Sequence, residues 1–167
     1  MDNVATRLLF FWGIRMNFYT DIAKMRAGRR KWEKLMKERY QPQNSKSLLL
    51  RTHCRTYGYY LTGCIPYNNM VRTTVEAMVA VMGGTQSLHT DLYNKAVGFP
   101  TPRSASVACN TQLILREKTV MTEVADTWGG SYMMERLTDN LYKSAKEILR
   151  EVEEEGGGGG DEVHQIR

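Results

Sequence analysis

The chain has 167 residues, of which 42% are hydrophobic and 25% charged, and this composition is enough for one globular core. No run of about 18 apolar residues occurs, so we expect no membrane-spanning helix. The formal net charge is +5, and between residues 24 and 39 eight Lys or Arg stand against two Glu. Such a basic run is more often the solvated face of a helix than a nucleic-acid site, and no aromatic nucleic-acid motif accompanies it. We therefore expect no nucleic-acid or membrane partner, and a basic binding module stays a minor alternative.

The three cysteines, Cys54, Cys64 and Cys109, are an odd number at irregular spacing. This favours reduced thiols and an intracellular protein over a disulfide framework. We expect Cys64 and Cys109 to be small buried apolar residues. His53 beside Cys54 raises the alternative of a metal site, but adjacent residues on an extended chain point to opposite faces, and zinc needs three or four protein ligands. No metal site is predicted.

Three short apolar segments alternate with helical patterns along the chain. The expected strands are Leu8–Gly13, which we expect to be buried on both faces, Ser47–Thr52 and Thr85–Thr90. The expected helices cover about residues 18–36, 66–82 (with an apolar stripe from Val71 to Met82), 104–116 and 134–152. Strands that alternate with crossover helices predict right-handed βαβ units and a parallel sheet.

The predicted fold class is therefore α/β, as a partial TIM-type (β/α) barrel of about three parallel strand–helix units plus a C-terminal helix. Three units are too few to close an eight-stranded barrel. We assign residues 1–155 to this partial barrel and residues 156–167, which begin with five glycines, to a flexible Gly-rich tail. In a parallel barrel the chemistry gathers in the loops at the carboxyl ends of the strands. His53, directly after the second expected strand, is expected on that rim.

Five segments carry a family resemblance: RLLFFWGIRMNFYTDIAKMRAGRRKWEKLM, NSKSLLLRTHCRTYG, PYNNMVRTTVEAM, GGTQSLHT and ADTWGGSYMME. Together they resemble the methylmalonyl-CoA mutase family, in unbroken order over nearly all of Arg7 to Glu155. The likeness corresponds to the C-terminal portion of the family's catalytic barrel. It implies isomerisation of methylmalonyl-CoA and succinyl-CoA, an acyl-CoA substrate, and adenosylcobalamin as the source of a radical.

The resemblance also implies partners and a compartment. It implies the rest of the mutase barrel, a cobalamin-binding domain and a mutase dimer, in the mitochondrial matrix of a eukaryote or the cytoplasm of a bacterium. The family's cobalt-ligating Asp-x-His-x-x-Gly motif is not present, since the late His164 stands outside such a motif. The strands that grip the migrating carboxylate are also missing from this sequence, so no catalytic residue is nominated.

Matched residue by residue, the resemblance implies two sets of binding positions. The substrate-binding positions are Arg7, His53 and Gln86. The cofactor-binding positions are Gly58, Lys95, Gly98 and Phe99. Each also has a structural interpretation: a solvated arginine, a strand-end histidine bound to backbone, a buried hydrogen-bonded amide, turn glycines and a phenylalanine that caps the core.

This chain also departs from the family pattern at six positions, one of which is the binding position Lys95. The family has Ser, Gln, Ser, Trp, Asn and Glu where this chain has Leu9, Arg55, Tyr57, Tyr59, Asp91 and Lys95. A charged lysine cannot accept the hydrogen bond that the family's glutamate takes from the adenosyl ribose. Arg55 and Lys95 add positive charge near an apolar site, and Asp91 could pair with one of them. The alternative is therefore a non-catalytic remnant or interaction protein that keeps the barrel packing without the site.

Overall fold

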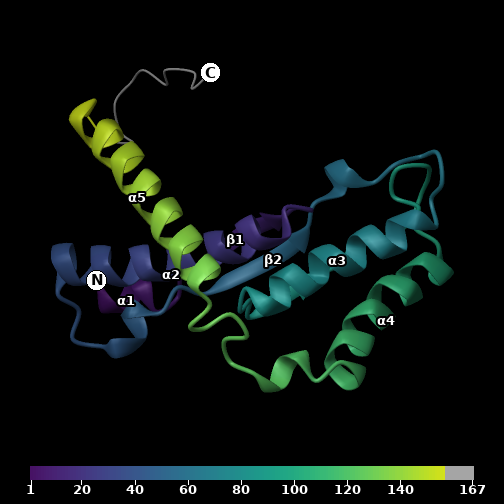
Figure 1. Cartoon of the computed structure of the whole chain (residues 1–167), viewed down its shortest axis with the longest axis horizontal. Helices are drawn as coiled ribbons and strands as arrows, with labels where there is room; N and C mark the ends of the chain where they lie inside the picture. Colours follow the sequence, from purple (N-terminus) through teal and green to yellow (C-terminus); the bar gives the residue numbers. More distant parts are fainter. Residues whose placement is uncertain (157–167) are drawn as a thin grey trace.

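The computed structural model describes residues 1–156, which fold around a three-stranded parallel sheet (Figure 1). Strands β1 (Phe10–Ile14), β2 (Thr52–Thr56) and β3 (Ser87–His89) lie side by side in that order. Both strand pairs are parallel, as the sequence predicts. The carboxyl ends of all three strands therefore lie at one edge of the sheet.

Helices connect these strands and extend beyond them. They are α1 (Asp2–Ala5), α2 (Phe18–Tyr40), α3 (Asn68–Met82), α4 (Pro102–Lys118) and α5 (Tyr132–Glu154), with 3₁₀ turns at Ser45–Leu48, Gly58–Tyr60 and Met121–Glu123. In Figure 1, α4 lies beside α3, and α5 leans across α2. Alternating strands and helices on a parallel sheet confirm the predicted partial (β/α) barrel.

The hydrophobic core lies between one face of the sheet and helices α2, α3 and α5. Its fully buried members include Ile14, Ile22, Met25, Cys54, Val79 and Met134. Successive side chains of a strand point to opposite faces, so Phe11 points away from this core, and it is 63% exposed. The expectation that the first strand is buried on both faces is therefore wrong for this chain, because the described helices cover only one face.

The second strand begins later than the sequence suggests. The expected strand Ser47–Thr52 starts as a 3₁₀ turn, in which Oδ1 of Asn44 accepts a hydrogen bond from the Lys46 N–H at 3.0 Å. The strand itself is Thr52–Thr56, in which residues 52, 54 and 56 are buried. Threonine is a good strand former but does not read as apolar, so an apolar run marks only the approach to this strand.

Helix α3 buries only part of the apolar stripe that the sequence predicts: Val79 is a core member and Met82 packs against the core. Val71 is 65% exposed, whereas Asn69, Thr73 and Glu76 are buried with the alanines of the same helix. Two of these polar groups bind backbone atoms: the Asn69 amide exchanges hydrogen bonds with the Thr62 backbone, and the Glu76 carboxyl accepts one from the Tyr57 N–H. Because the periodicity of apolar residues takes no account of polar ones, it does not predict a buried helix face that contains polar side chains.

Two expectations concern the Gly-rich tail and the absence of a membrane-spanning helix. Helix α5 ends at Glu154, and residues 157–167, which make up most of the predicted Gly-rich tail, lie outside the described residues. The division into residues 1–155 and 156–167 thus stays a prediction. Among the helices of residues 1–156, none combines the length and the apolar character needed to cross a membrane.

The packing of α2 against β1 gives a stability prediction. A Cβ atom at Gly28 would lie 2.3 Å from Cη2 of Trp12, whereas a Cβ at Gly98 would have no atom within 4 Å. Because overpacking outweighs the helix propensity that alanine adds, we expect Gly28→Ala to lower the free energy of unfolding by about 1–2 kcal/mol. The matched Gly98→Ala change should stay within about 0.5 kcal/mol of the parent in the same urea titration. Equal effects of the two substitutions would contradict this packing.

Candidate functional site

The candidate site is the edge of the sheet where the parallel strands end, which we call the strand-end face. A cleft of about 370 Å³ opens there. It is lined by Phe11, Gly13, Arg55, Thr56, Tyr57, Gly58, Tyr59 and Lys95. These residues come from β1, from β2 and its following turn, and from the loop after β3. Loops at the carboxyl ends of parallel strands are where α/β proteins usually bind ligands.

The Asp91 carboxylate joins β2 to the loop after β3. The Asp91 side chain is 2% exposed, and its Oδ1 lies 3.0 Å from Nη2 of Arg55 and 3.0 Å from Nζ of Lys95. The Asp91 backbone N–H also donates to Oγ1 of Thr56 at 2.8 Å. A buried carboxylate needs such partners because an unpaired buried charge is costly. Asp91 thus pairs with both cations, whereas the sequence predicts a pair with one of them.

The Lys95 ammonium covers Gly58. A Cβ atom at Gly58 would lie 2.7 Å from Nζ of Lys95 and 3.0 Å from Oδ2 of Asp91. Aromatic rings stand beside this contact: the Tyr57 and Tyr59 ring centroids are 6.2 Å apart, and Tyr59 is 82% exposed. The strand-end face therefore combines accessible aromatic rings with a charge cluster of two cations and one carboxylate.

A second charge cluster sits at the end of β1. Asp21, in the first turn of α2, is fully buried, and its Oδ1 lies 3.1 Å from Nη2 of Arg15 and 3.2 Å from Nζ of Lys24. Nζ of Lys24 also donates to the Gly13 carbonyl at 3.0 Å. Asp21 therefore fixes the end of β1 against α2, just as Asp91 fixes the end of β2 against the loop after β3.

Glu76 of α3 is a fully buried carboxyl group behind the strand-end face. Its Oε2 accepts a hydrogen bond from the Tyr57 N–H at 3.0 Å, and its Oε1 has no hydrogen-bond partner within residues 1–156. Burial raises the pKa of Glu76 from 4.5 to about 8, opposed by the Tyr57 hydrogen bond and aided by the nearby charge of Asp91. Glu76 is therefore mostly neutral at pH 7, and it holds the turn that lines the cleft.

The structure places His53 within β2 rather than in the loop after it. Its Nδ1 lies 2.7 Å from Oγ of Ser87, and its ring centroid is 5.2 Å from that of Phe11. The expected position on the rim is wrong because β2 continues to Thr56. His53 instead lies in the middle of the open face of the sheet.

Two further predicted residues lie near the opposite edge of the sheet. Arg7 precedes β1 and is exposed. Gln86 precedes β3, and its side chain accepts a hydrogen bond from the Thr52 N–H at 2.6 Å and donates one to the Gly84 carbonyl at 3.1 Å. The Gln86 amide therefore already joins the amino ends of β2 and β3.

The remaining predicted residues follow β3. Gly98 donates its N–H to the Asn94 carbonyl at 3.0 Å, and the Asn94 side chain donates to the Phe99 carbonyl at 2.9 Å. The Phe99 ring is 91% exposed, so it does not cap the core. Of the seven predicted residues, the structure brings only Gly58 and Lys95 into direct contact at the cleft.

Sequence reasoning missed several residues of this site and misplaced two cysteines. Glu76 and Asp21 were not nominated, because nothing in the spacing of an acidic residue on a helix reveals a buried partner. Cys64 and Cys109 are exposed rather than buried. No three metal-ligating side chains converge anywhere in residues 1–156.

Comparison with known proteins shows the family. The family model described as methylmalonyl-CoA mutase matches residues 1–160. The chain belongs to the methylmalonyl-CoA mutase family. The mitochondrial methylmalonyl-CoA mutase of Mus musculus is 59% identical over 157 residues, which cover 94% of this chain and 21% of that relative. The methylmalonyl-CoA mutase of Escherichia coli is 45% identical, with 94% of this chain and 22% of that relative covered. The chain thus spans about a fifth of the length of these relatives.

The charge cluster around Asp91 gives a prediction about Arg55, Asp91 and Lys95, three of the positions where we expect this chain to depart from the methylmalonyl-CoA mutase pattern. The double substitution Arg55→Gln with Lys95→Glu removes both cations and leaves the buried carboxylate beside a new negative charge. We expect it to lower the free energy of unfolding by about 1–3 kcal/mol, a discounted figure because both cations are partly exposed. Adding Asp91→Asn should recover most of this loss, as measured by urea unfolding. A double variant as stable as the parent would show that Asp91 does not depend on these cations.

The raised pKa of Glu76 predicts how the free energy of unfolding depends on pH. Because its pKa is raised on folding, the folded state retains a proton that the unfolded state releases above pH 4.5. The free energy of unfolding should therefore fall as the pH rises from about 4.5 to about 8 and then level off. The isosteric Glu76→Gln variant still offers an acceptor to Tyr57, and it should lack this component. Parallel pH profiles for the parent and the variant would rule out a buried neutral Glu76.

Proposed function

We propose that this chain is part of the catalytic barrel of an adenosylcobalamin-dependent acyl-CoA mutase, which interconverts methylmalonyl-CoA and succinyl-CoA by radical carbon-skeleton rearrangement. The observation that carries the proposal is the family match over 94% of the chain, at 45% to 59% identity. The partly open sheet, with ligand-accessible rings at its carboxyl edge, supports the same proposal.

The proposed substrate and cofactor positions lie in a spatial order. Arg7 and Gln86 precede β1 and β3, His53 lies within β2, and Gly58 and Lys95 follow β2 and β3. An elongated acyl-CoA lying along the open face of the sheet would meet the first three in turn and bring its acyl end toward the strand-end face. This order supports the division into a substrate part and a cofactor part.

In this proposal His53 donates a hydrogen bond to the substrate, and its own contact with Ser87 determines which ring nitrogen can donate. When the Ser87 hydroxyl donates to Nδ1 across their 2.7 Å separation, the ring proton resides on Nε2. Nε2–H can then donate to a thioester carbonyl above the sheet. Ser87 would thus orient the imidazole and select the donating tautomer.

The strand-end face fits a large flat cofactor through its exposed rings. Tyr59 and Phe99 are among the most exposed apolar side chains of the chain, and they can cover a bound ligand and exclude water from it. When bound, adenosylcobalamin would supply the radical chemistry, while the protein positions and shields the reacting groups. Gly58 would allow close approach of the backbone once the Lys95 side chain moves aside.

Lys95 determines which hydrogen-bonding groups the strand-end face presents to the cofactor. Its ammonium group provides donors only, and the neighbouring acceptor, the Asp91 carboxylate, is buried and engaged by Arg55 and Lys95. No acceptor is therefore offered at position 95. We expect this chain to bind adenosylcobalamin more weakly than a chain with a glutamate there.

The partners and the compartment belong to the same proposal. The proposed partners are the remaining barrel, a cobalamin-binding domain and a second mutase subunit. The relatives from Mus musculus and Caenorhabditis elegans are named as mitochondrial, and the family also occurs in Escherichia coli. We propose the mitochondrial matrix for a eukaryotic source and the cytoplasm for a bacterial one.

A spectroscopic titration tests cofactor binding. The purified chain should perturb the visible spectrum of adenosylcobalamin, and the triple variant Arg55→Gln, Asp91→Asn, Lys95→Glu should reach half-saturation at about tenfold lower protein concentration, because one good hydrogen bond to a charged group is worth roughly that factor. The surface control Lys118→Glu, on α4, should behave as the parent. An unchanged spectrum with all three proteins would contradict cofactor binding by this chain and favour the non-catalytic alternative.

A further inference from the structure

A groove between α2 and α5 lies apart from the strand-end face. It encloses about 340 Å³, and its lining includes Lys31, Lys34, Leu35, Tyr142, Lys146 and Leu149. The two helices run in the same direction, since Arg30 pairs with Asp139 and Arg39 pairs with Glu153. Helix α2 starts at the carboxyl end of β1, so its C-terminal half, which lines the groove, extends toward the opposite edge of the sheet (Figure 1).

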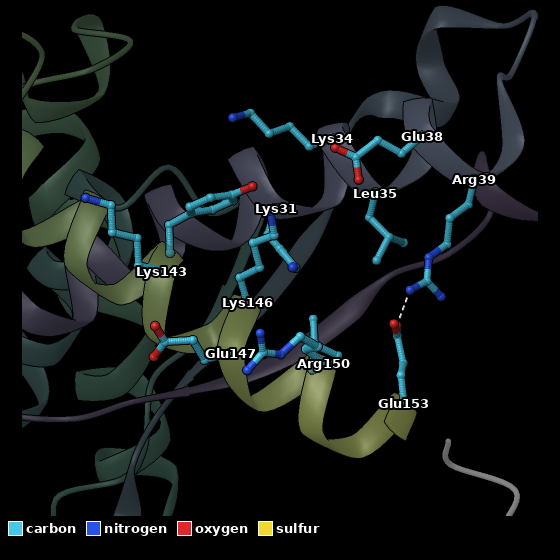
Figure 2. A pocket seen from close by; sticks show the side chains of 12 residues that line it. Lys31, Lys34, Leu35, Glu38, Arg39, Lys143, Lys146, Glu147, Arg150 and Glu153 are labelled. Carbon is cyan, nitrogen blue, oxygen red and sulfur yellow. Dashed lines mark hydrogen bonds and ion pairs between the residues drawn. The ribbon is translucent and has the colours of Figure 1, made fainter. Parts of the chain in front are cut away.

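The groove carries an excess of positive charge. Six Lys or Arg and three Glu line it. Arg39, Lys143 and Arg150 are held in ion pairs with Glu153, Asp139 and Glu154. In the described part of the chain, no ion pair engages Lys31, Lys34 or Lys146. Figure 2 shows the Lys31 and Lys146 side chains extending from the two facing helices into the groove.

Two lining carboxylates, Glu38 and Glu147, also make no ion pair within residues 1–156. Their charge opposes an anion in the groove and lowers its affinity. They do not neutralise Lys31 and Lys146 by direct contact, so two like charges face each other from opposite helices, an arrangement that an anion relieves. Removing these carboxylates should therefore have the opposite effect from removing the lysines.

Helix dipoles do not account for these lysines. Lys31 stands nine residues before the end of α2 (40 − 31), and Lys146 stands eight residues before the end of α5 (154 − 146). The stabilisation of a cation by a helix C terminus is confined to the last turn. The helix dipoles therefore do not explain why cations stand at mid-helix on both walls of one groove.

The Tyr142 ring is surrounded by cations. Cζ of Arg30 lies 4.6 Å, Nζ of Lys34 5.1 Å and Nζ of Lys31 5.7 Å from its centroid. The ring quadrupole attracts each cation only weakly at an exposed site and carries no net charge. The ring thus gathers cations without neutralising them, and its hydroxyl adds a further hydrogen-bond donor.

We propose that this groove binds the phosphate group of a soluble phosphate monoester. Lys31 and Lys146 approach the phosphate from opposite helices, and Lys34 and the Tyr142 hydroxyl supply further donors. Charge-assisted hydrogen bonds to phosphate are among the stronger polar contacts in proteins. Leu35 and Leu149 give the groove an apolar lining for the organic part of the ester. The proposal is independent of the proposed mutase function.

Calorimetric titration of the full chain with phenyl phosphate at low ionic strength tests this site. We expect one site per chain, weakened by added salt. The double variant Lys31→Gln, Lys146→Gln should weaken binding by at least tenfold, whereas the charge-matched control Lys37→Gln, Lys118→Gln should change it by less than about threefold. The variant Glu38→Gln, Glu147→Gln should bind more tightly than the parent. Circular dichroism should confirm that all variants fold.

Three results would overturn the proposal. The first is no binding of phenyl phosphate by the folded parent. The second is an equal loss of affinity in the groove variant and its charge-matched control, which would indicate diffuse attraction to a basic protein. The third is tighter binding to phosphatidylserine vesicles that phenyl phosphate does not displace, which would make the groove a membrane contact instead.

Discussion

The pairing of the buried Asp91 carboxylate with Arg55 and Lys95 is the interaction on which the strand-end face depends. β3 has only three residues and so contributes few ladder hydrogen bonds. The loop that follows it is fixed to β2 through the Asp91 backbone, which binds Thr56, and through the Asp91 side chain. Because the carboxylate is buried, it costs free energy unless both cations are in place. The position of Lys95 over Gly58 follows from this requirement.

This arrangement joins Arg55, Asp91 and Lys95, three of the six expected departures from the family pattern, in one cluster. Taken singly, Arg55 and Lys95 would each place an uncompensated charge beside an apolar site. Taken with Asp91, they form one cluster with a net charge of +1, in which each cation stays partly exposed to water. The three charges meet at the strand-end face, whereas the hydrophobic core lies between the sheet and helices α2, α3 and α5.

The sequence predicted the fold better than it predicted the site. Apolar runs and helical stripes were sufficient for the order of elements and the parallel sheet, because both report burial directly. They failed where the buried residues are polar. The strand β2 contains buried threonines and therefore lies further along the chain than the apolar run predicts. In α3, Asn69 and Glu76 are buried, whereas Val71 is exposed. The site depends on pairings such as that of Asp91 with Arg55, which lie 36 residues apart and cannot be read from spacing.

Amide hydrogen exchange at Asp91 tests the central claim most directly. Asp91 lies outside every helix and strand, so secondary structure alone gives its N–H no protection. Because that N–H donates to the buried Thr56 hydroxyl and the side chain is anchored by two cations, we expect it to exchange as slowly as the amides of β2. Exchange at the rate of an ordinary exposed loop would show that the end of β3 is not fixed to β2, and would contradict this account of the strand-end face.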